Sequence, residues 1–549
     1  MRSCAKNKLY MIGALVILLV MGLKGPLACA ENPSRGQVRQ PLNPEIAQKK
    51  AYVHRLMKQK EGAGADVSAA RLFLEQSRIA MQHGNAEECL RLLDRAVASL
   101  GEENAVAQTK SESIIPTKSI VRKIELPVGS GQFEVIELVP NHTSGKDIER
   151  YTSAFESYPL ISKNGHVQLS VGSVPLMVKD VPNQKDTVKS EQIVSNCKDS
   201  PFGIHDIDKF DDRLVNLGTC WVRNAGRTSL VWNIAEPEKG KYDWSRTDTV
   251  LNDLRRNNIC MIVNISTFNH WDQGRERGRG SKKLVKDINA YQSFLQKAVQ
   301  RYPFVNAWQI ENEPNNPMFW ADTPENYLIL LKASYQAIKH ANPDALVVIG
   351  GASHPRALDE NFWSQIFMLL EKEKGKAHCF DVFDCHWFLH ADRHMENIEQ
   401  LTEYIQNVRK KLDKVGYQDV PVWIAEMASY SAKPESMPEV SEQQHASELV
   451  KLYVRSLSLG VSKIFWVRLI EWSGFKGRSN GYFDNTGLIS NPRNHGDSHE
   501  KLAYYSYKKL VEAFKGVNLK TAEALTLGNH IQAYKFLIDG RPIYFVWGD

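Results

Sequence analysis

Between residues 200 and 515, short apolar runs of strand type alternate with segments of helical periodicity about eight times. This alternation limits the possible folds more than any other feature, because parallel strands joined by helices close into a (β/α)8 TIM barrel. We therefore predict the α/β class, with a barrel over 196–515. The predicted strands are 202–204, 219–224, 260–265, 305–310, 346–350, 380–386, 422–426 and 464–469.

Two of the predicted strands end in a glutamate. The fourth delivers Asn312 and Glu313 and is stopped by Pro314, which has no amide hydrogen for a sheet. Because successive side chains of a strand point to opposite faces, Asn312 and Glu313 can serve one site only where the strand gives way to a loop. The seventh predicted strand ends at Glu426, which is expected to share a buried face with Ile424.

Two carboxyl groups at separate strand ends are what the cleavage of a glycosidic bond requires. One donates a proton to the leaving oxygen, and the other attacks or stabilises the oxocarbenium-like carbon. The plain alternative is that Glu313 and Glu426 only cap strands or pair with arginines. Two acids at matching strand tips, one of them in an Asn-Glu-Pro setting, favour the catalytic interpretation.

With both acids in this order, the chain resembles glycoside hydrolase clan A, the retaining glycosidases built on a (β/α)8 barrel, over roughly residues 200–515. The xylosidase- and iduronidase-like branch and the cellulase-like branch are the most similar. The resemblance implies that Glu313 is the acid/base, that Asn312 binds the sugar 2-hydroxyl and that Glu426 is the nucleophile. In retaining enzymes the two carboxyl groups stand about 5–5.5 Å apart.

Three further strand residues are candidates for binding the substrate. Arg223 at the end of the second strand is costly inside a barrel unless it is paired, so we expect it to salt-bridge an acid near the site. The resemblance implies that Arg223 supports the nucleophile and that His386 lines the sugar subsite, with Phe388 where relatives often carry a tyrosine. It also implies that Trp466, expected to face inward with Ile464, forms the floor of the subsite; simple core packing is the alternative.

Other polar residues near strand ends are not expected to take part in the reaction. Glu236 is assigned an architectural role, and Glu311 lies before the strand tip. His390, Asp392 and His394 share one polar loop, and ordinary solvated residues explain them better than a metal site. The expected chemistry needs no metal and no cofactor.

The N-terminus has the layout of a secretory signal peptide over residues 1–30. Arg2 and Lys8 precede an apolar run over 9–23, and Ala28-Cys29-Ala30 follows as a cleavage site. We expect cleavage after Ala30 and a secreted or periplasmic protein; a lipoprotein anchored at Cys29 is the alternative. After removal of the signal, no segment approaches the roughly 20 apolar residues of a membrane span.

The regions on either side of the barrel differ in pattern. Residues 31–105 are predicted to be a polar linker and a helical hairpin. Strand patterns return over 113–195 and again over 516–549. Because three or four strands alone make a poor domain, we predict one accessory β-sandwich built from both flanks of the barrel.

Composition and cysteine usage exclude some classes. A formal charge of +6, spread over 69 basic and 63 acidic residues, is too dilute to indicate nucleic acid binding. The six cysteines beyond the predicted signal show no paired spacing, so free buried thiols are expected, although Cys220 and Cys260 lie on neighbouring predicted strands.

The sequence thus predicts an exported retaining glycoside hydrolase that acts on an oligosaccharide, a polysaccharide or a glycoconjugate. Two alternatives stay open. The first is a catalytically inactive barrel that only binds carbohydrate. The second is a transglycosidase that uses the same covalent intermediate. The sugar, its linkage and exo or endo action are not encoded in any motif of the chain.

Overall fold

The computed structural model describes residues 86–100, 121–140, 155–181, 197–268, 271, 283–392, 395–435, 437–472, 480–496, 498–538 and 540–548, with short runs between 49 and 77. The predicted signal peptide and His394 lie outside the described residues. Among the residues that are described, no helix combines the length and the apolar character needed to cross a membrane.

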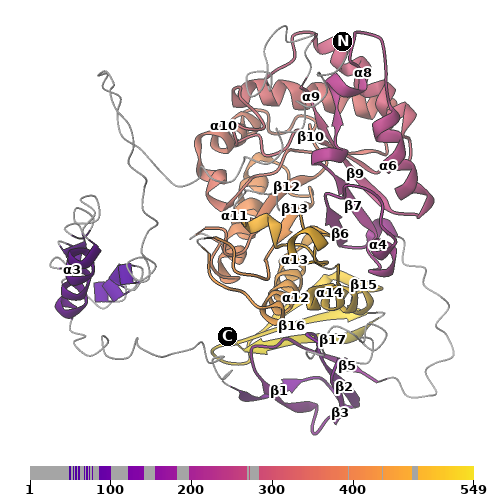
Figure 1. Cartoon of the computed structure of the whole chain (residues 1–549). Helices are drawn as coiled ribbons and strands as arrows, with labels where there is room; N and C mark the ends of the chain where they lie inside the picture. The colour runs from indigo at the N-terminus through magenta and orange to yellow at the C-terminus, as the bar shows by residue number, and fades with distance from the viewer. Residues whose placement is uncertain are drawn as a thin grey trace. The chain divides into compact units, whose positions relative to one another are not determined.

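Eight parallel strands form the barrel that the sequence predicts (Figure 1). Their order around the sheet is β11-β10-β9-β7-β6-β14-β13-β12, and parallel bridges from Val348 to Val382 and from Ala352 to Cys385 join its two ends. The short strand β8 (Leu230–Val231) pairs with β9. The barrel strands are β6 (Phe202–His205), β7 (Trp221–Asn224), β9 (Cys260–Ser266), β10 (Ala307–Ile310), β11 (Leu346–Val348), β12 (Phe383–Phe388), β13 (Val422–Ala428) and β14 (Val461–Val467).

Helices follow the strands and surround the barrel (Figure 1). Their ends carry the capping residues that favour helix starts: the side chain of Thr323 accepts from the amide of Asn326, and that of Ser441 accepts from the amide of Gln444. The helices of this region are α4 (Asp212–Asn216), α5 (Trp232–Ala235), α6 (Ser245–Arg256), α8 (Ile288–Arg301), α9 (Pro324–Ala341), α10 (Asn361–Glu371), α11 (Glu399–Val415), α12 (Glu442–Ser458), α13 (Pro492–His495) and α14 (Leu502–Ala513).

The interior of the barrel is apolar below the strand tips. Trp221, Trp423 and Phe465 are buried there in one cluster with smaller residues of the other strands. Gly203 leaves space for the ring of Phe465, because a Cβ atom at this position would lie 2.4 Å from that ring. Apart from Lys463, whose Nζ lies 4.4 Å from the centre of the Trp221 ring, the described polar side chains of the interior gather at the carboxyl end of the strands, where active sites of this fold lie.

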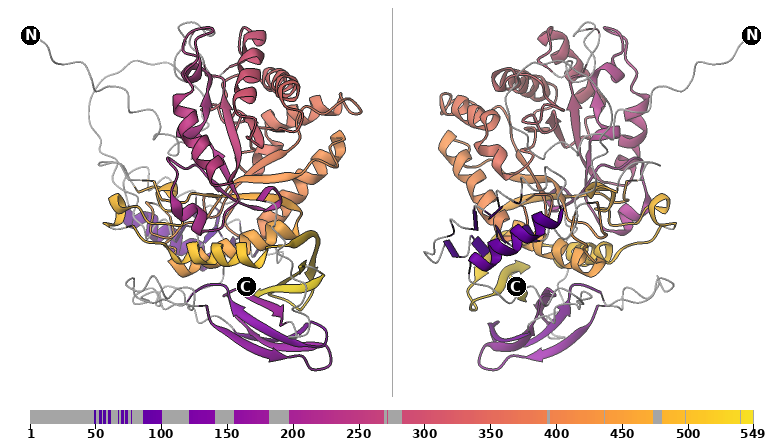
Figure 2. Two further views of the ribbon diagram at one scale, coloured as in Figure 1. Left: turned by 90° about the vertical axis from the view of Figure 1, so that its right-hand side faces the viewer. Right: turned by 60° about the vertical axis from the view of Figure 1, so that its left-hand side comes forward.

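Strands from both flanks of the barrel form one sheet, as predicted (Figure 2). Its order is β15-β16-β17-β5-β2-β3, and the C-terminal β17 pairs with β5 from before the barrel. One face shares an apolar core with the two-stranded sheet β1-β4, and Phe545 on the other face stacks on Phe514 after α14. The strands are β1 (Arg122–Pro127), β2 (Gln132–Glu137), β3 (Ser157–Ile161), β4 (His166–Val171), β5 (Leu176–Asp180), β15 (Val517–Leu525), β16 (Ile531–Ile538) and β17 (Arg541–Gly548).

The described N-terminal residues belong to a separate compact unit within 19–119. Helix α3 (Ala86–Ser99) buries Cys89, Leu93 and Val97 against helical residues between 49 and 77, among them Val53 and Leu74. Helices that pack on each other in this way agree with the predicted helical hairpin.

The expectation of free thiols throughout is wrong for one pair. Cys197 and Cys220 form a disulfide with their Cα atoms 5.1 Å apart, whereas Cys260 is buried and free. No local pattern reveals this pairing, because Cys197 begins the short 3-10 helix Cys197–Asp199 before β6, and its approach to Cys220 just before β7 depends on the tertiary fold. Cys89, Cys379 and Cys385 are free and buried, as expected.

Candidate active site

The tip of β10 turns sharply and presents two side chains to one site. The backbone of Glu311 has a φ of 59° and that of Glu313 a φ of 40°, both in the left-handed region that non-glycine residues rarely adopt. Such strain, about 1–3 kcal/mol for each residue, clusters at functional sites. The turn begins right after Ile310 and allows Asn312 and Glu313 to reach neighbouring partners, as the position of Pro314 predicts.

Glu426 enters the site by a different local device. The pairing of β13 with β14 is irregular between Ile424 and Met427, and the pairing of β12 with β13 shifts register just before His386 and Glu426. Ile424 packs toward the helices while Ala425 lines the barrel interior. The expected common face of Ile424 and Glu426 is therefore wrong, and an irregularity of the bulge type directs the carboxylate into the barrel.

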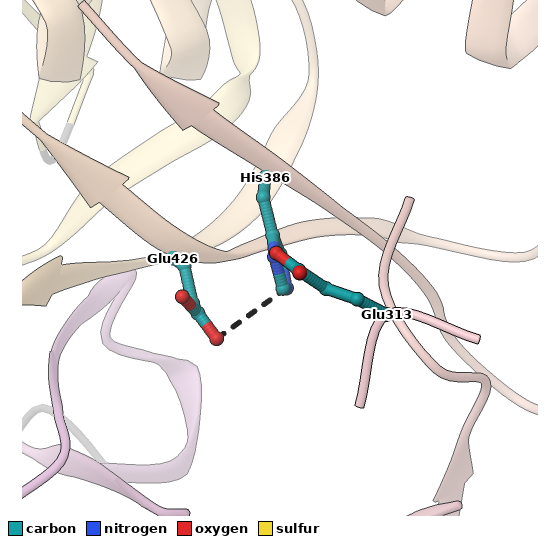
Figure 3. A group of neighbouring side chains, drawn as sticks. All are labelled: Glu313, His386 and Glu426. Atoms are coloured by element: carbon teal, nitrogen blue, oxygen red, sulfur yellow. Dashed lines mark hydrogen bonds and ion pairs between the residues drawn. The ribbon is translucent and has the colours of Figure 1, made fainter. Parts of the chain in front are cut away.

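The two carboxyl groups and an imidazole converge at the mouth of the barrel (Figure 3). One atom from each of Glu313, His386 and Glu426 can be chosen so that all three lie within 4.8 Å of one another. Both glutamates are buried, with 9% of each residue exposed. This separation of carboxylate oxygens is near that of retaining glycosidases and well below the roughly 6.5–9.5 Å of inverting enzymes.

Arg223 holds the Glu426 side of the site. It is fully buried, and its Nη1 donates to Oε1 of Glu426 at 2.7 Å. Its Nη2 donates to Oδ1 of Asn312 at 2.7 Å, and its Nε donates to Oε1 of Gln309 at 2.6 Å. Burial raises the pKa of Glu426, and the charges of His386 and Arg223 oppose that increase.

His386 holds the Glu313 side. Its Nδ1 lies 2.8 Å from Oε1 of Glu313, its Nε2 lies 3.2 Å from Oδ2 of Asp384, and Nε2 is 3.8 Å from Oε1 of Glu426. Burial alone would lower the pKa of His386, but the charges of Glu426 and Asp384 and the hydrogen bonds to Asp384 and Glu313 outweigh it and raise that pKa to about 10. The imidazole is therefore a cation at neutral pH.

Three polar residues of the site were not among the predicted site residues. His205 at the tip of β6 accepts from Arg223 through Nδ1 at 2.8 Å, and burial with the neighbouring charge of Arg223 lowers its pKa well below the ordinary value. Gln309 and Asp384 lie one layer deeper and are fully buried. Alternation along β10 and β12 places both on the inward face, which was the available signal.

Trp466 does not form the floor of the site. It is fully buried, stacks on Tyr453 of α12, and its indole nitrogen donates to the backbone oxygen of Thr486 at 3.0 Å. Phe465 is the residue of β14 that faces the barrel interior. The inward assignment fails because every residue near Trp466 in this strand is apolar and buried on both faces, so alternation gives no direction. The alternative of simple core packing is correct.

An aromatic wall leads outward from His386. The ring of Phe388 lies 6.1 Å from the imidazole, Phe483 lies 5.0 Å from Phe388, and Trp472 lies 6.0 Å from Phe483. The guanidinium of Arg468 stands 5.1 Å above the Trp472 ring. Phe483 and Trp472 are half-buried and so keep part of their ring surface accessible.

The residues expected to be inert have structural partners. Glu236 accepts from the indole of Trp232 at 2.6 Å and from the amide of Gly240 at 2.7 Å. Glu311 accepts from the amide and the hydroxyl of Thr267. His390 lies 2.8 Å from a carboxylate oxygen of Glu448, so it is held by an acid of α12.

The spacing of Glu313, His386 and Glu426 is one that a divalent cation can use. The electrostatics favour another arrangement. Arg223 already forms an ion pair with Glu426, and the cationic His386 already faces Glu313. A bound metal would have to displace a proton from His386 and compete with a buried guanidinium, so these residues are a poor fit to a resident ion.

Comparisons with known proteins agree with this geometry. The family model of cellulases (glycosyl hydrolase family 5) matches residues 204–468, which contain both glutamates. No curated protein matches the sequence. A family 39 glycoside hydrolase from the gut symbiont Bacteroides cellulosilyticus WH2 has a similar structure, with a TM-score of 0.52 and 17% identity over 78% of this chain and 87% of that one.

Two further solved structures are less similar. A glucosidase from Croceicoccus marinus has a TM-score of 0.47 and 15% identity over 62% of this chain and 76% of its own. A monomeric beta-xylosidase from Caulobacter crescentus CB15 has a TM-score of 0.44 and 16% identity over 62% of this chain and 73% of its own. The cellulase family model, which spans both acids on the barrel, confirms the resemblance of this chain to the glycoside hydrolases of clan A.

Proposed function

We propose that this protein is a retaining glycoside hydrolase in which Glu426 is the nucleophile and Glu313 the acid/base. The observation that carries the proposal is the pair of facing carboxylates within 4.8 Å, each with a different cationic partner. Arg223 favours the ionised form of Glu426, as a nucleophile requires. His386 bonds only one oxygen of Glu313 and leaves Oε2 for the substrate, apart from a 3.3 Å hydrogen bond from Asn316.

In the first step, an oxygen of Glu426 attacks the anomeric carbon, and Glu313 transfers its proton to the departing glycosidic oxygen. The bond from the anomeric carbon to that oxygen breaks as the ester bond to Glu426 forms. Asn312 is oriented by Arg223 through its carbonyl oxygen, so its amide nitrogen is free to donate to the sugar 2-hydroxyl.

In the second step, Glu313 accepts a proton from water as the water oxygen attacks the anomeric carbon of the covalent intermediate. The ester bond breaks, the sugar leaves with its original anomeric configuration, and both carboxyl groups return to their starting charges. Replacing water by a sugar hydroxyl in this step gives transglycosylation, which uses the same residues.

The substrate we propose is a glycan or glycoconjugate. Sugar rings stack on aromatic faces, and the wall of Phe388, Phe483 and Trp472 supplies such faces beside the catalytic pair. We also propose that the protein is exported. The signal-like sequence at residues 1–30 supports export, and so does the disulfide between Cys197 and Cys220, because disulfides persist mainly in oxidising compartments.

The test is a panel of 4-nitrophenyl and 2,4-dinitrophenyl glycosides assayed with wild type, Glu426→Ala and Glu313→Ala. Both variants should lose at least about 100-fold in turnover of the best substrate. With added azide, Glu313→Ala should give a glycosyl azide of retained configuration, and Glu426→Ala one of inverted configuration, because each azide takes the place of the missing group.

Glu236→Gln is the matched control, since it changes a buried glutamate outside the pair and should lower stability without removing turnover. Wild-type activity that persists in Glu426→Ala would refute the assigned roles. Binding of oligosaccharides without turnover of any glycoside would favour the inactive carbohydrate-binding barrel.

A further inference from the structure

Asp384 lies directly beneath the catalytic pair and takes no part in the reaction as described so far. It is fully buried on β12, two residues before His386. Its Oδ1 accepts from the backbone amide of Ala425 at 2.9 Å. Its Oδ2 accepts from Nε2 of Gln309 at 2.6 Å and lies 3.2 Å from Nε2 of His386. Burying a carboxylate is costly, and these three partners compensate the cost. We therefore ask what the carboxylate does for them.

Gln309 carries the influence of Asp384 to the nucleophile. A carboxylate only accepts, so it fixes the amide of Gln309 with its nitrogen toward Asp384 and its oxygen toward Arg223. That oxygen accepts from Nε of Arg223 at 2.6 Å, and the same guanidinium donates to Glu426 at 2.7 Å. Three consecutive hydrogen bonds thus join Asp384 to Glu426.

His386 carries the influence of Asp384 to the acid/base. Because Asp384 accepts at Nε2, that nitrogen bears a hydrogen, and the cationic ring has a second hydrogen at Nδ1 to donate to Oε1 of Glu313. The transferable proton of Glu313 then occupies Oε2, toward the substrate. A neutral ring with its hydrogen on Nε2 would instead accept that proton at Nδ1 and hold it away from the leaving group.

The charges of the cluster balance in both steps only when Asp384 is counted. In the free enzyme, Arg223 and His386 are positive, Glu426 and Asp384 are negative, and Glu313 carries the proton. In the covalent intermediate, Glu426 is a neutral ester and Glu313 is ionised. The sum is zero in each state, and the acid that stays charged throughout is Asp384.

We propose that Asp384 is the positioning residue for both catalytic carboxyls: it keeps His386 cationic against Glu313, and through Gln309 it orients Arg223 against Glu426. The proposal rests on the proposed retaining mechanism. The local packing supports it, because a Cβ atom at Gly351 would lie 2.3 Å from Nε2 of His386 and 2.7 Å from Oδ2 of Asp384. The backbone of Gly351 therefore packs closely against both the carboxylate and the imidazole, and a side chain at this position would displace them.

The charged groups that face His386 give the expected pH dependence. They are Asp384, Glu313 and Glu426, with His205 near enough that His386 lowers its pKa. In the covalent intermediate Glu426 is uncharged, so Asp384 and Glu313 alone hold the imidazolium. Without Asp384 the ring loses its proton at neutral pH, and Glu313 no longer faces a cation when it has to act as the base.

The experiment compares Asp384→Asn with Asp381→Asn, which removes a carboxylate near the start of the same strand that pairs with Lys339 outside the circuit. The full-length protein is labelled with ¹⁵N-histidine, and the His386 resonance is assigned with His386→Gln. In wild type and Asp381→Asn the ring should stay cationic to about pH 10. In Asp384→Asn its midpoint should fall to about pH 7 or below; a midpoint that stays more than about one unit above neutrality overturns the proposal.

Kinetics with 2,4-dinitrophenyl glycosides test the consequence for catalysis. These leaving groups need no proton, so breakdown of the covalent intermediate limits kcat. Asp384→Asn should lower kcat at pH 7 at least tenfold and move the acid limb of kcat to higher pH, further than the acid limb of kcat/KM, because Arg223 still pairs with Glu426. Equal shifts of both limbs, or none, would argue for a merely structural residue.

Gln309→Met separates the route from Asp384 to Glu426 from the route to Glu313, and it replaces Asp384→Asn as the test if that variant does not fold. It leaves Asp384 on His386 but removes the acceptor of Arg223, so kcat/KM should fall while the His386 midpoint stays within half a unit of wild type. A large midpoint shift in this variant contradicts the proposal. If no glycoside is turned over by wild type, the proposed function fails, yet the histidine titration still decides whether Asp384 sets the charge of His386.

Discussion

Replacing Arg223 with methionine should destabilise the protein strongly and in a pH-dependent way. The fully buried guanidinium donates to Glu426, Gln309 and Asn312, and His205 lies 2.8 Å from it. Methionine fills similar volume but leaves the Glu426 carboxylate buried without its closest cation. Breaking a buried ion pair from one side costs about 3–5 kcal/mol, more than any surface pair.

The pH dependence gives the decisive sign. Burial already raises the pKa of Glu426 in the folded state, and removal of Arg223, whose charge lowers it, should raise it further. A group whose folded pKa is raised favours folding below its unfolded pKa of about 4.3, and that contribution is lost as the pH climbs through the folded value. The deficit of Arg223→Met should therefore be small at pH 4 and largest at pH 7 and above.

The assay is urea-induced unfolding of wild type, Arg223→Met and Arg213→Met at pH 4, 5.5, 7 and 8. Arg213 forms a partly exposed ion pair with Asp211 at 2.9 Å, so its loss should cost no more than about 1 kcal/mol. A deficit below about 1 kcal/mol for Arg223→Met at pH 7, or one that does not change with pH, would show that Arg223 does not compensate the charge of Glu426.

Three further predictions follow from the other parts of the structure. Trp466→Ala should lower the unfolding free energy by about 3–5 kcal/mol while the KM of the residual folded enzyme stays within twofold, since the indole packs on α12 and not on substrate; a large rise in KM alone would restore it as the subsite floor. Trp472→Ala should raise KM about tenfold and leave the thermal midpoint unchanged, because the substrate loses roughly 1–1.5 kcal/mol of stacking on the ring. An unchanged KM for every glycoside would show that the substrate does not contact Trp472. Cys197→Ser should cost about 3.5 kcal/mol, the loop-closure value for a sequence separation of 23, measurable as a loss of stability that reducing agent also produces in wild type but not in the variant.

Strand tips were the most predictable part of the site. β10 ends at Ile310, a few residues before Pro314, and the run before Glu426 is a strand by composition, so the convergence of the two acids at one site could be predicted from the chain alone. Arg223 was predictable as well, because a cation inside a barrel must have an anionic partner, and the structure supplies Glu426.

The direction of some side chains and the long-range partners of others could not be predicted in this way. The direction of Trp466 depends on which side of an all-apolar strand meets the barrel, and that of Glu426 depends on an irregularity that breaks alternation. The hydrogen bond between Gln309 and Asp384 joins residues 75 positions apart, and the disulfide of Cys197 joins a three-residue 3-10 helix to a residue next to β7. These features arise from the closure of the barrel, which no local pattern contains.

The pairing of β17 with β5 joins the segment that follows the barrel to the segment that precedes it. Val546 of β17 is the register partner of Leu176 of β5, which precedes the first barrel strand, and Phe545 also stacks on Phe514 beside the last barrel helix. A shortened protein that begins at β6 or stops after α14 would expose the apolar surface that this clasp covers. The catalytic barrel should therefore be produced with residues 122–548 intact, and attempts to trim it to the eight-stranded core should yield aggregated material.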